Sequence, residues 1–212
     1  MPPINQVDSM EVKDRILQKA NDLFMRYGIR SVTMDEIAGQ LGISKKTIYQ
    51  FYSDKDELVH AVFHEIMQKN HDNCIKYRED SDNAIHEQFL ASDMVQEMFA
   101  NMNPSILFDM QRFHPKVFAE FEKYKKEFIY SILKDNIKRG IAEGLFREDI
   151  DVDIIARLQL LTVSLLHDDE FVQYKNGLAA IERQTKEFFL YGLATAKGQK
   201  LIQKYKQQRQ KQ

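Results

Sequence analysis

The sequence is poor in several features whose abundance would point to particular classes of protein. A single cysteine, Cys74, excludes a disulfide framework and a cysteine-based zinc site. Only 8 glycines and 4 prolines interrupt the 212 residues, so secondary-structure elements can be long. No apolar run approaches the roughly 18 residues that a membrane-spanning helix needs, and no basic-then-apolar leader opens the sequence. We therefore expect a cytoplasmic protein that does not interact with a membrane.

Signatures of enzymes and of metal sites are also missing. The phosphate-binding motifs GxGxxG and Walker A do not occur, and neither does the nucleophile motif GxSxG. His60 and His64 have the spacing of metal ligands on one helix, but no HExxH run accompanies them. His167 opens a polar stretch, 167–170, that we interpret as a helix end. We therefore expect no catalytic residue, no metal and no cofactor, and we predict that the protein is not an enzyme.

The spacing of apolar residues predicts an all-α protein. Apolar residues make up 43% of the chain, which is enough for a core of ordinary size. In the first helical segment, from Val12 to Tyr27, they follow one helix face: Ile16, Leu17, Ala20, Leu23 and Phe24. Gly28 then suits the left-handed conformation that ends many helices. No convincing strand pattern occurs in the sequence.

A second helix is predicted to begin directly after Thr33. Thr33 is a good N-cap, and Glu36, three residues later, completes a capping box. Val32 and Ile37 stand at the positions of a hydrophobic staple. The helix ends at Gly42, which can take a turn conformation that a Cβ would oppose.

A third helix follows that turn and completes a helix-turn-helix. Ser44 is its N-cap, Ile48 faces inward, and the small Ala38 lets the two helices approach closely. We expect this helix to continue to Tyr52. Its outward or flanking side chains are donors for phosphates and base edges: Lys45, Lys46, Thr47, Tyr49 and Gln50. Two lysines at a helix start are commonly just solvated surface, but they oppose the helix dipole, so helix stability does not explain them.

The segment from Ile16 to Leu58 resembles the DNA-binding domain of the TetR family of transcriptional regulators. The resemblance rests on Ala20-x-x-Leu23-Phe24-x-x-x-Gly28, Thr33-Met34-Asp35-Glu36-Ile37-Ala38, the run from Leu41 to Tyr49, and Tyr52-x-x-Lys55-x-x-Leu58. The candidate DNA contacts, nearly all of them implied by this resemblance, are Thr33, Ser44, Lys45, Lys46, Thr47, Tyr49, Gln50 and Lys55. Phe51 departs from the family, in which many members carry a histidine or tyrosine here, and it cannot make their hydrogen bond to a phosphate.

The remainder of the chain is also predicted to be helical. Predicted helices cover residues 54–77, 84–102, 105–113, 115–143, 152–166 and 176–196, which gives about nine helices in all. The resemblance, which the segment 137–147 extends less specifically, implies a helical ligand-binding and dimerisation domain. We therefore divide the chain into a DNA-binding domain, 1–55, a ligand-binding and dimerisation domain, 56–196, and a tail, 197–212. The tail has six basic and no acidic residues and no apolar stripe, so we expect it to be disordered, with at most a weak, salt-dependent contact to DNA.

Phenylalanine and methionine are concentrated between residues 63 and 118. Each of them alone is more simply explained as ordinary core. Together they would allow an apolar cavity, because methionine adapts to irregular spaces, and the resemblance favours a pocket for a small hydrophobic effector. The candidate pocket residues are Phe63, Met67, Phe89, Met98, Phe99, Met102, Phe108, Met110 and Phe113.

The last two predicted helices carry apolar stripes that suit pairing with a second copy of the chain. Two antiparallel helices from each subunit would form a four-helix interface around a two-fold axis, although one more layer of core within one chain would give the same pattern. The candidate interface residues are Ile154, Leu158, Leu161, Leu165, Ile181, Phe188, Phe189 and Gly192. A dimer also suits DNA, since two recognition helices about 34 Å apart read a palindrome.

Together these features predict a ligand-responsive transcriptional regulator. Its simplest form is a repressor that binds a palindromic operator as a homodimer and is released by a small hydrophobic effector. The formal net charge is −2, and residues 1–56 hold eight basic and eight acidic residues, so charge alone does not indicate nucleic-acid binding. The alternative is a helical protein that binds a ligand or partner but not DNA, against which the outward donors of the helix-turn-helix argue.

Overall fold

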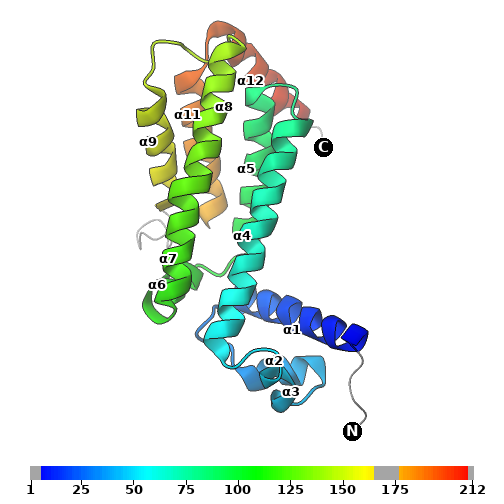
Figure 1. Cartoon of the computed structure of the whole chain (residues 1–212). Coiled ribbons are helices and arrows are strands. Elements are labelled where there is room, and N and C mark those ends of the chain that lie inside the picture. The colour runs from blue at the N-terminus through cyan, green and yellow to red at the C-terminus, as the bar shows by residue number, and fades with distance from the viewer. Residues whose placement is uncertain (1–5, 165–176, 210–212) are drawn as a thin grey trace. The chain divides into compact units, whose positions relative to one another are not determined.

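The computed structural model describes residues 6–164 and 177–209, and within these ranges the fold is all-α, as predicted (Figure 1). The helices are α1 (Gln6–Tyr27), α2 (Met34–Leu41), α3 (Lys45–Tyr49), α4 (Lys55–Asp80), α5 (Ala84–Asn101), α6 (Ile106–Phe113), α7 (Pro115–Tyr124), α8 (Tyr130–Ala142), α9 (Val152–Ser164), α11 (Gly177–Leu193) and α12 (Ala196–Arg209). A π-helical turn, Lys125–Ile129, joins α7 to α8, so these two form the single long helix that the sequence predicts. None of the described helices combines the length and apolarity needed to cross a bilayer.

Three helix boundaries differ from the prediction by several residues. Helix α1 begins at Gln6 rather than near Val12, and α4 continues to Asp80 into a stretch that we expected to be a loop. Helix α3 ends at Tyr49 and passes into a turn, three residues earlier than expected. The predicted helix ends at residues 166 and 176 lie outside the described residues.

The chain divides into two compact units. The first unit consists of residues 1–69 and 101–121, and the second unit consists of residues 70–100 and 122–212. Helix α4 contributes residues to both. The first unit holds the helix-turn-helix and extends past residue 55, where the sequence suggested the end of the DNA-binding domain.

The core of the first unit lies under α1, α2 and α3. Phe24, Ile37 and Ile48 are fully buried there, together with Leu58 of α4 and Ile106 of α6. The long segment from α4 and the short α6 therefore belong to the same core as the helix-turn-helix. This shared burial gives the short helices α2 and α3 more apolar support than they would have with α1 alone.

A glycine at the end of α1 lets the chain turn against α6. Gly28 has a φ of +82°, the left-handed conformation predicted for it. A Cβ at this position would also collide with the hydroxyl of Ser105. Glycine is therefore required at Gly28 for space as well as for conformation.

The core of the second unit joins α5, α8, α9, α11 and α12. Ile85, Ile137, Leu190 and Ile202 are almost completely buried in one apolar cluster. Gly140 packs against the ring of Phe146 so closely that a Cβ would not fit. This contact explains why glycine and phenylalanine occur six residues apart in this stretch.

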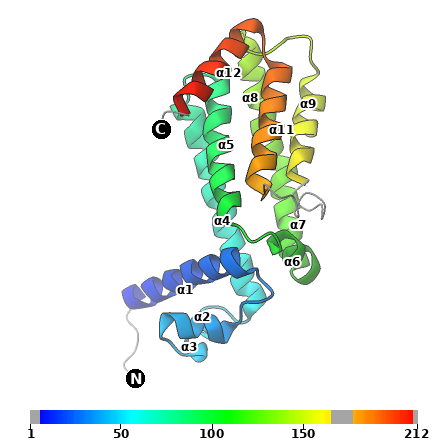
Figure 2. The same cartoon turned by 180° about the vertical axis from the view of Figure 1, so that it is seen from behind.

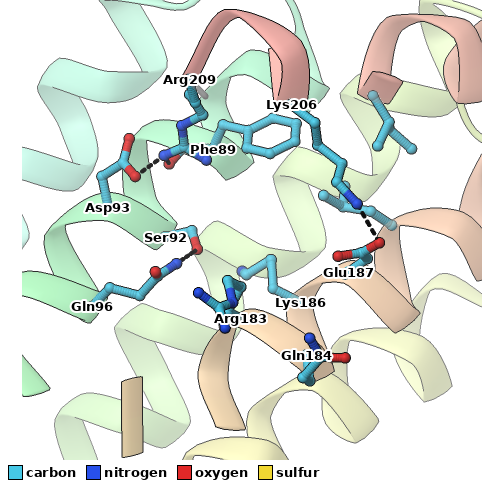
Figure 3. A pocket seen from close by; sticks show the side chains of 12 residues that line it. Phe89, Ser92, Asp93, Gln96, Arg183, Gln184, Lys186, Glu187, Lys206 and Arg209 are labelled. Carbon is cyan, nitrogen blue, oxygen red and sulfur yellow. Dashed lines mark hydrogen bonds and ion pairs between the residues drawn. The ribbon is translucent and has the colours of Figure 1, made fainter. Parts of the chain in front are cut away.

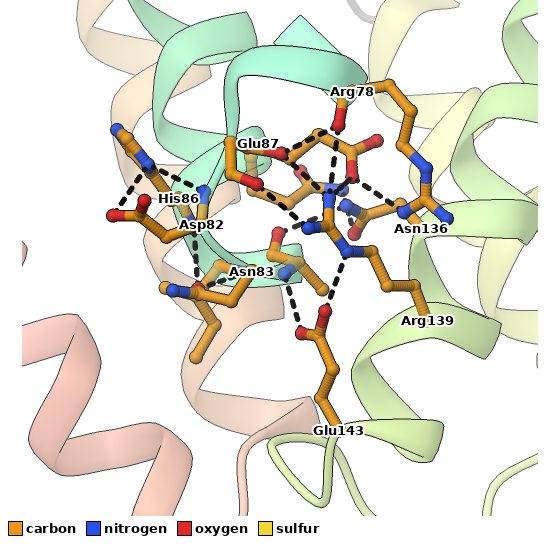
Figure 4. A network of polar contacts seen from close by, with 12 residues as sticks. Arg78, Asp82, Asn83, His86, Glu87, Asn136, Arg139 and Glu143 are labelled. Carbon is orange, nitrogen blue, oxygen red and sulfur yellow. Dashed lines mark hydrogen bonds and ion pairs between the residues drawn. The ribbon is translucent and has the colours of Figure 1, made fainter.

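A network of charged side chains connects the α4–α5 loop to α8 (Figure 4). The guanidinium of Arg139 donates to Glu87 Oε2 at 2.9 Å and to Glu143 Oε1 at 2.7 Å. It also donates to the carbonyl oxygen of Ser81 at 2.9 Å, and Arg78 donates to Glu87 Oε2 at 3.1 Å. Because Glu87 is nearly buried, these bonds compensate a carboxylate that has lost most of its hydration.

The last helix corrects the prediction of a disordered tail. Residues 196–209 form α12, whose Gly198 approaches the carbonyl oxygen of Leu145 too closely to carry a Cβ. Ile202 is buried in the core, and the hydroxyl of Tyr205 accepts a hydrogen bond from Asn83 at 2.9 Å. The prediction was wrong because it took a high density of lysine and glutamine as a sign of disorder, whereas a few apolar contacts on one face hold the helix.

Candidate nucleic-acid interface and ligand cavity

The helix-turn-helix has the capped geometry that its sequence predicts. Thr33 Oγ1 accepts a hydrogen bond from the amide of Glu36 at 3.1 Å, and Ser44 Oγ accepts one from the amide of Thr47 at the same distance. Gly42 lies between the helices with a φ of +66°. The two caps fix where each helix begins, and the glycine fixes the angle of the chain between them.

The inner side of α3 is packed, and its other sides face outward. Ile48 is fully buried against α2, whose Ile37 and Ala38 are also buried. The exposed residues of the candidate set are Thr33, Ser44, Lys45, Lys46, Tyr49 and Gln50, and Thr47 is half-buried. The structure therefore presents most of the candidate DNA contacts together on one exposed helix end.

Lys45 forms an ion pair that the sequence analysis missed. Its Nζ lies 2.7 Å from Asp35 Oδ2, and this hydrogen bond raises the pKa of Lys45. The same Nζ lies 6.0 Å from the centroid of the Tyr49 ring. Asp35 thus places a negative charge beside the candidate interface and competes with any phosphate for Lys45. The only signal in the sequence was an acidic residue in the first turn of α2, which the helix dipole explains by itself.

Two of the candidate contacts have structural roles in the first unit. Thr33 caps α2, as described above. Lys55 is half-buried, and its Nζ donates to the carbonyl oxygen of Ile29 at 2.6 Å. Burial lowers the pKa of Lys55. Lys55 therefore holds the turn after α1 in place, and any contact with a phosphate stays a prediction.

A buried carboxylate attaches α6 to the turn between α1 and α2. Asp109 Oδ2 accepts hydrogen bonds from the amide of Arg30 at 2.9 Å and from the hydroxyl of Ser105 at 3.3 Å. The amide of Asn103 donates to the carbonyl oxygen of Met25 at 2.6 Å. The bonds from Arg30 to Asp109 and from Asn103 to Met25 join residues more than 70 positions apart, so no local pattern in the sequence could have revealed them.

The candidate dimer residues are mainly exposed on two neighbouring helices. Helices α9 and α11 lie side by side in both views (Figures 1 and 2). Ile154, Leu158 and Leu161 of α9 are 57%, 45% and 60% exposed, and Phe188 of α11 is 76% exposed. Gly192 is exposed and Phe189 is half-buried, whereas Ile181 is buried within its own chain. Leu165 lies outside the described residues.

The candidate pocket residues do not gather in one unit. Phe63, Met67, Met102, Phe108, Met110 and Phe113 belong to the first unit, and Phe89, Met98 and Phe99 belong to the second. Phe108 and Phe113 are exposed, 58% and 41%, so the structure does not support a place for them in an enclosed pocket. Phe63, Met110, Phe99 and Phe89 are buried, as the simpler interpretation of ordinary core also requires.

A cavity of about 570 Å³ lies between α5, α11 and α12 in the second unit (Figure 3). Helix α5 contributes side chains from Phe89 to Gln96, α11 from Arg183 to Leu190, and α12 from Ile202 to Arg209. Of the nine candidate pocket residues, only Phe89 lines it. The sequence did not predict this cavity, because its lining is largely polar and because α12, which forms one wall, was expected to be a disordered tail.

The histidines set aside in the sequence analysis have ordinary partners. His60 Nε2 lies 2.9 Å from Glu120 Oε2, and the rings of His60 and His64 stack with their centroids 6.1 Å apart. In the part of the chain that the structure describes, no three histidine, cysteine or acidic side chains cluster as metal ligands. The stretch 167–170 lies outside the described residues.

Residues 16–62 match the family model of bacterial regulatory proteins described as the tetR family. This match covers α2, α3 and parts of α1 and α4, the region whose geometry is described above.

Longer alignments extend the similarity beyond this region. The chain is 26% identical over 161 residues to an uncharacterized HTH-type transcriptional regulator, YvaF, of Bacillus subtilis, covering 74% of this chain and 82% of the relative. It is 24% identical over 157 residues to the HTH-type transcriptional repressor KstR2 of Mycolicibacterium smegmatis, covering 68% and 72%. Among solved structures, a TetR-family transcriptional regulator from Agrobacterium tumefaciens superposes with a TM-score of 0.72 at 17% identity, over 88% of this chain and 100% of that one.

Proposed function

Because the chain belongs to the TetR family of bacterial transcriptional regulators, a family of DNA-binding proteins, we propose that it is a repressor that binds a palindromic operator as a homodimer. A small-molecule effector then releases it from the DNA. Regulators of this family bind DNA and small-molecule ligands and act as dimers, and they are generally not enzymes. The operator, the sense of regulation and the effector are the specific parts of this proposal.

The exposed end of α3 carries the DNA-binding part of the proposal. Lys46, Tyr49 and Gln50 are exposed, while Ile48 beneath them is fully buried and holds the helix in a fixed orientation. A cation, a phenol and an amide on one short helix can bond both phosphates and base edges in the major groove. Lys46 takes part in none of the ion pairs described here, so its charge is available to a phosphate.

The exposed apolar face of α9 and α11 supports the homodimer. Ile154, Leu158 and Leu161 recur every three or four residues, which places them in one row along α9. Together with Phe188 they expose more apolar surface than a lone solvated helix normally carries. Burying this row against its copy around a two-fold axis would remove it from water and fix the separation of the two recognition helices.

A test of the dimer uses charge in the middle of that row. Leu158→Glu should convert a dimer into a monomer in sedimentation velocity, because two carboxylates would face each other across the axis. Arg157→Glu, on the neighbouring exposed position of the same helix, is the matched control and should leave the dimer intact. A dimer that survives Leu158→Glu unchanged would place the interface elsewhere.

The effector acts through a two-state equilibrium of the dimer. Binding of the effector releases DNA only if its affinity is higher for the conformation that binds DNA poorly. Helix α4 begins directly after the helix-turn-helix and continues into the second unit, so its movement is a physical route for coupling.

The test of DNA binding is fluorescence anisotropy on the DNA upstream of the protein's own gene, with a scrambled duplex beside it. We expect tight, sequence-dependent binding that weakens as the salt concentration rises. The double substitution Lys46→Ala and Tyr49→Ala should weaken binding by about tenfold or more without changing the dimer, since single contacts of this kind are worth about 1–3 kcal/mol. Lys116→Ala, an exposed lysine of the same unit outside the helix-turn-helix, is the control.

Two results would overturn parts of this proposal. If the double variant binds operator as tightly as the wild type, the recognition helix is assigned wrongly. If no duplex from genome-wide selection binds specifically, and mass spectrometry finds no bound ligand, the protein is instead a helical ligand- or partner-binding protein that does not bind DNA.

A further inference from the structure

Each of the helices α5, α11 and α12 forms one wall of the cavity. The lining residues of a wall are spaced so that they lie on one face of their helix. Phe89, Ser92 and Gln96 come from one face of α5, and Arg183, Lys186 and Leu190 come from one face of α11. The volume of about 570 Å³ is within the range of small-molecule sites, about 300–1,000 Å³. The cavity therefore offers room for a ligand within the second unit alone.

Two cations in this cavity have no carboxylate partner among the described residues. Lys186 Nζ donates to the neutral amide oxygen of Gln88 at 2.7 Å, and no described carboxylate lies within 4 Å of it. Arg183 likewise forms no ion pair with a described residue. Figure 3 shows the Lys186 side chain pointing from α11 toward Ser92 of α5, with Arg183 beside it. Burial lowers the pKa of Lys186, because it removes hydration from the charged form.

The other charges of the cavity are paired. Lys206 of α12 forms an ion pair with Glu187, and Arg209 forms one with Asp93. The lining thus holds four cations and two carboxylates, and the excess positive charge belongs to Arg183 and Lys186.

One further carboxylate lies behind the lining. Glu182 accepts a hydrogen bond from Ser92 Oγ at 2.9 Å, and burial raises its pKa, so its charged form is disfavoured. Its negative charge opposes the effect of burial on the pKa of Lys186 and so compensates part of the charge of that lysine from more than 4 Å away. With Glu182 counted, four cations still face three carboxylates, so one positive charge remains in excess.

The apolar part of the lining is continuous with the core. Phe89, Leu190 and Ile202 line the cavity and also belong to the buried cluster of the second unit. An apolar group placed against them would be removed from water at a gain of about 25 cal/mol per Å² of its surface. The cavity thus combines an unpaired cationic end with an apolar wall.

We propose that this cavity binds a small amphiphilic carboxylate. Its acid group is held between Arg183 and Lys186, and its apolar part lies along Phe89, Leu190 and Ile202. The idea that this ligand is the effector rests on the proposed function, whereas its binding to the cavity does not. It refines the prediction of a hydrophobic effector, because the cationic end of the cavity favours a ligand that also carries an acid group.

The test uses three probes with the same chain and different head groups. Octanoate, 1-octanol and octylammonium are titrated into the full-length dimer by isothermal calorimetry without DNA. We expect octanoate to bind at one saturable site per chain and the other two to bind at least tenfold more weakly. If 1-octanol binds as tightly as octanoate, the cavity has no subsite for an acid group. If octylammonium binds more tightly than octanoate, the subsite prefers a cation and the proposal is wrong. No saturable binding of octanoate up to about 5 mM, where a millimolar site is mostly filled, would overturn the proposal.

Two variants and one control locate the subsite. Arg183→Gln removes an exposed charge and should leave folding intact, while octanoate affinity falls about tenfold, as expected for a charge-assisted hydrogen bond. Lys186→Met should abolish the preference for octanoate over octanol. Lys200→Gln removes a cation from α12 outside the cavity. It should change neither the affinity for octanoate nor the preference for octanoate over octanol. Full affinity in both Arg183→Gln and Lys186→Met would mean that octanoate binds elsewhere.

A separate measurement asks whether this ligand is the effector. Octanoate is added to the protein bound to its operator, and DNA release is followed by anisotropy. If octanoate binds but no DNA is bound to begin with, the proposed function fails and the cavity remains. If DNA is bound and octanoate binds the cavity without releasing it, only the role of the ligand as effector fails.

Discussion

The ion pair between Asp35 and Lys45 makes a specific prediction about the strength and salt dependence of DNA binding. In the structure the Lys45 ammonium is 2.7 Å from an Asp35 oxygen, so its charge is neutralised locally instead of being offered to a phosphate. Asp35 also adds a negative charge where a phosphate is expected to lie. Asp35→Asn should therefore free Lys45 and reduce the repulsion at the same time.

The size of the effect follows from counterion release. Each phosphate neutralised by a lysine adds about 0.9 to the slope of log affinity against log salt concentration. Between 50 and 200 mM salt, one additional contact makes the affinity fall by about a further 3.5-fold. We therefore expect Asp35→Asn to bind operator more tightly than the wild type at 50 mM salt, with a slope steeper by nearly one. Its thermal stability should change little, because the pair is exposed.

Three other variants make this measurement decisive. Glu36→Gln removes the same charge from the same helix turn but leaves the pair intact, so its slope should equal that of the wild type. Lys45→Met and the double variant Asp35→Asn with Lys45→Met should share one slope, since neither has a lysine to free. If Asp35→Asn gives the slope of the wild type in the same anisotropy series, Lys45 does not contact a phosphate and the reasoning is refuted.

Three further predictions concern the fold. Ile202→Ala should lower the free energy of unfolding by about 2–5 kcal/mol in urea titration, since the side chain is 1% exposed in the core; a loss below about 1 kcal/mol would mean that α12 is not docked. Arg139→Met should cost about 1–3 kcal/mol, because Glu87 keeps only Arg78 as a partner, and adding Glu87→Gln should recover part of the loss; a double variant no more stable than the single one would contradict this account. Burial raises the pKa of Cys74 to about 11, so at pH 8 only about 0.1% of the thiol is ionised and a disulfide reagent should react slowly with the native protein but rapidly in urea; immediate reaction of the native protein would show that Cys74 is accessible.

The helix-turn-helix could be predicted from the sequence because the interactions that define it are local. Thr33, Gly42 and Ser44 act on residues within four positions of themselves, and the structure contains the bonds that their spacing predicts. The inward position of Ile48 follows from the same short-range periodicity. A pattern of this kind fixes which side chains face outward even before the partners of the domain are known.

The charged features of the candidate sites could not be predicted in this way. Asp35 and Lys45 are ten residues apart, and Asp109 and Arg30 are separated by 79, so only the folded chain brings them together. The cavity in the second unit depends on α12, which itself depends on a few contacts of Gly198, Ile202 and Tyr205. Gly198, Ile202 and Tyr205 are spaced four and three residues apart, which places them on one face of a helix. This spacing was the one signal in the sequence that α12 would pack against the core of the second unit.

The attachment of the helix-turn-helix to the rest of its unit has a consequence for how such a protein can change. Three hydrogen bonds contribute to this attachment. The carboxylate of Asp109 accepts one from the main-chain amide of Arg30, and the ammonium of Lys55 donates one to the carbonyl oxygen of Ile29. The main-chain amide of Asn103 donates the third to the carbonyl oxygen of Met25. At the end of α1 and in the turn after it, the atom that takes part in each of these bonds belongs to the main chain. Any residue except proline can supply the main-chain amide, and any residue can supply the carbonyl oxygen. If α3 reads DNA as proposed, substitutions along its outer surface would alter the sequence that is read while the connection behind it stays the same, so the specificity for an operator would change without a change in the rest of the unit.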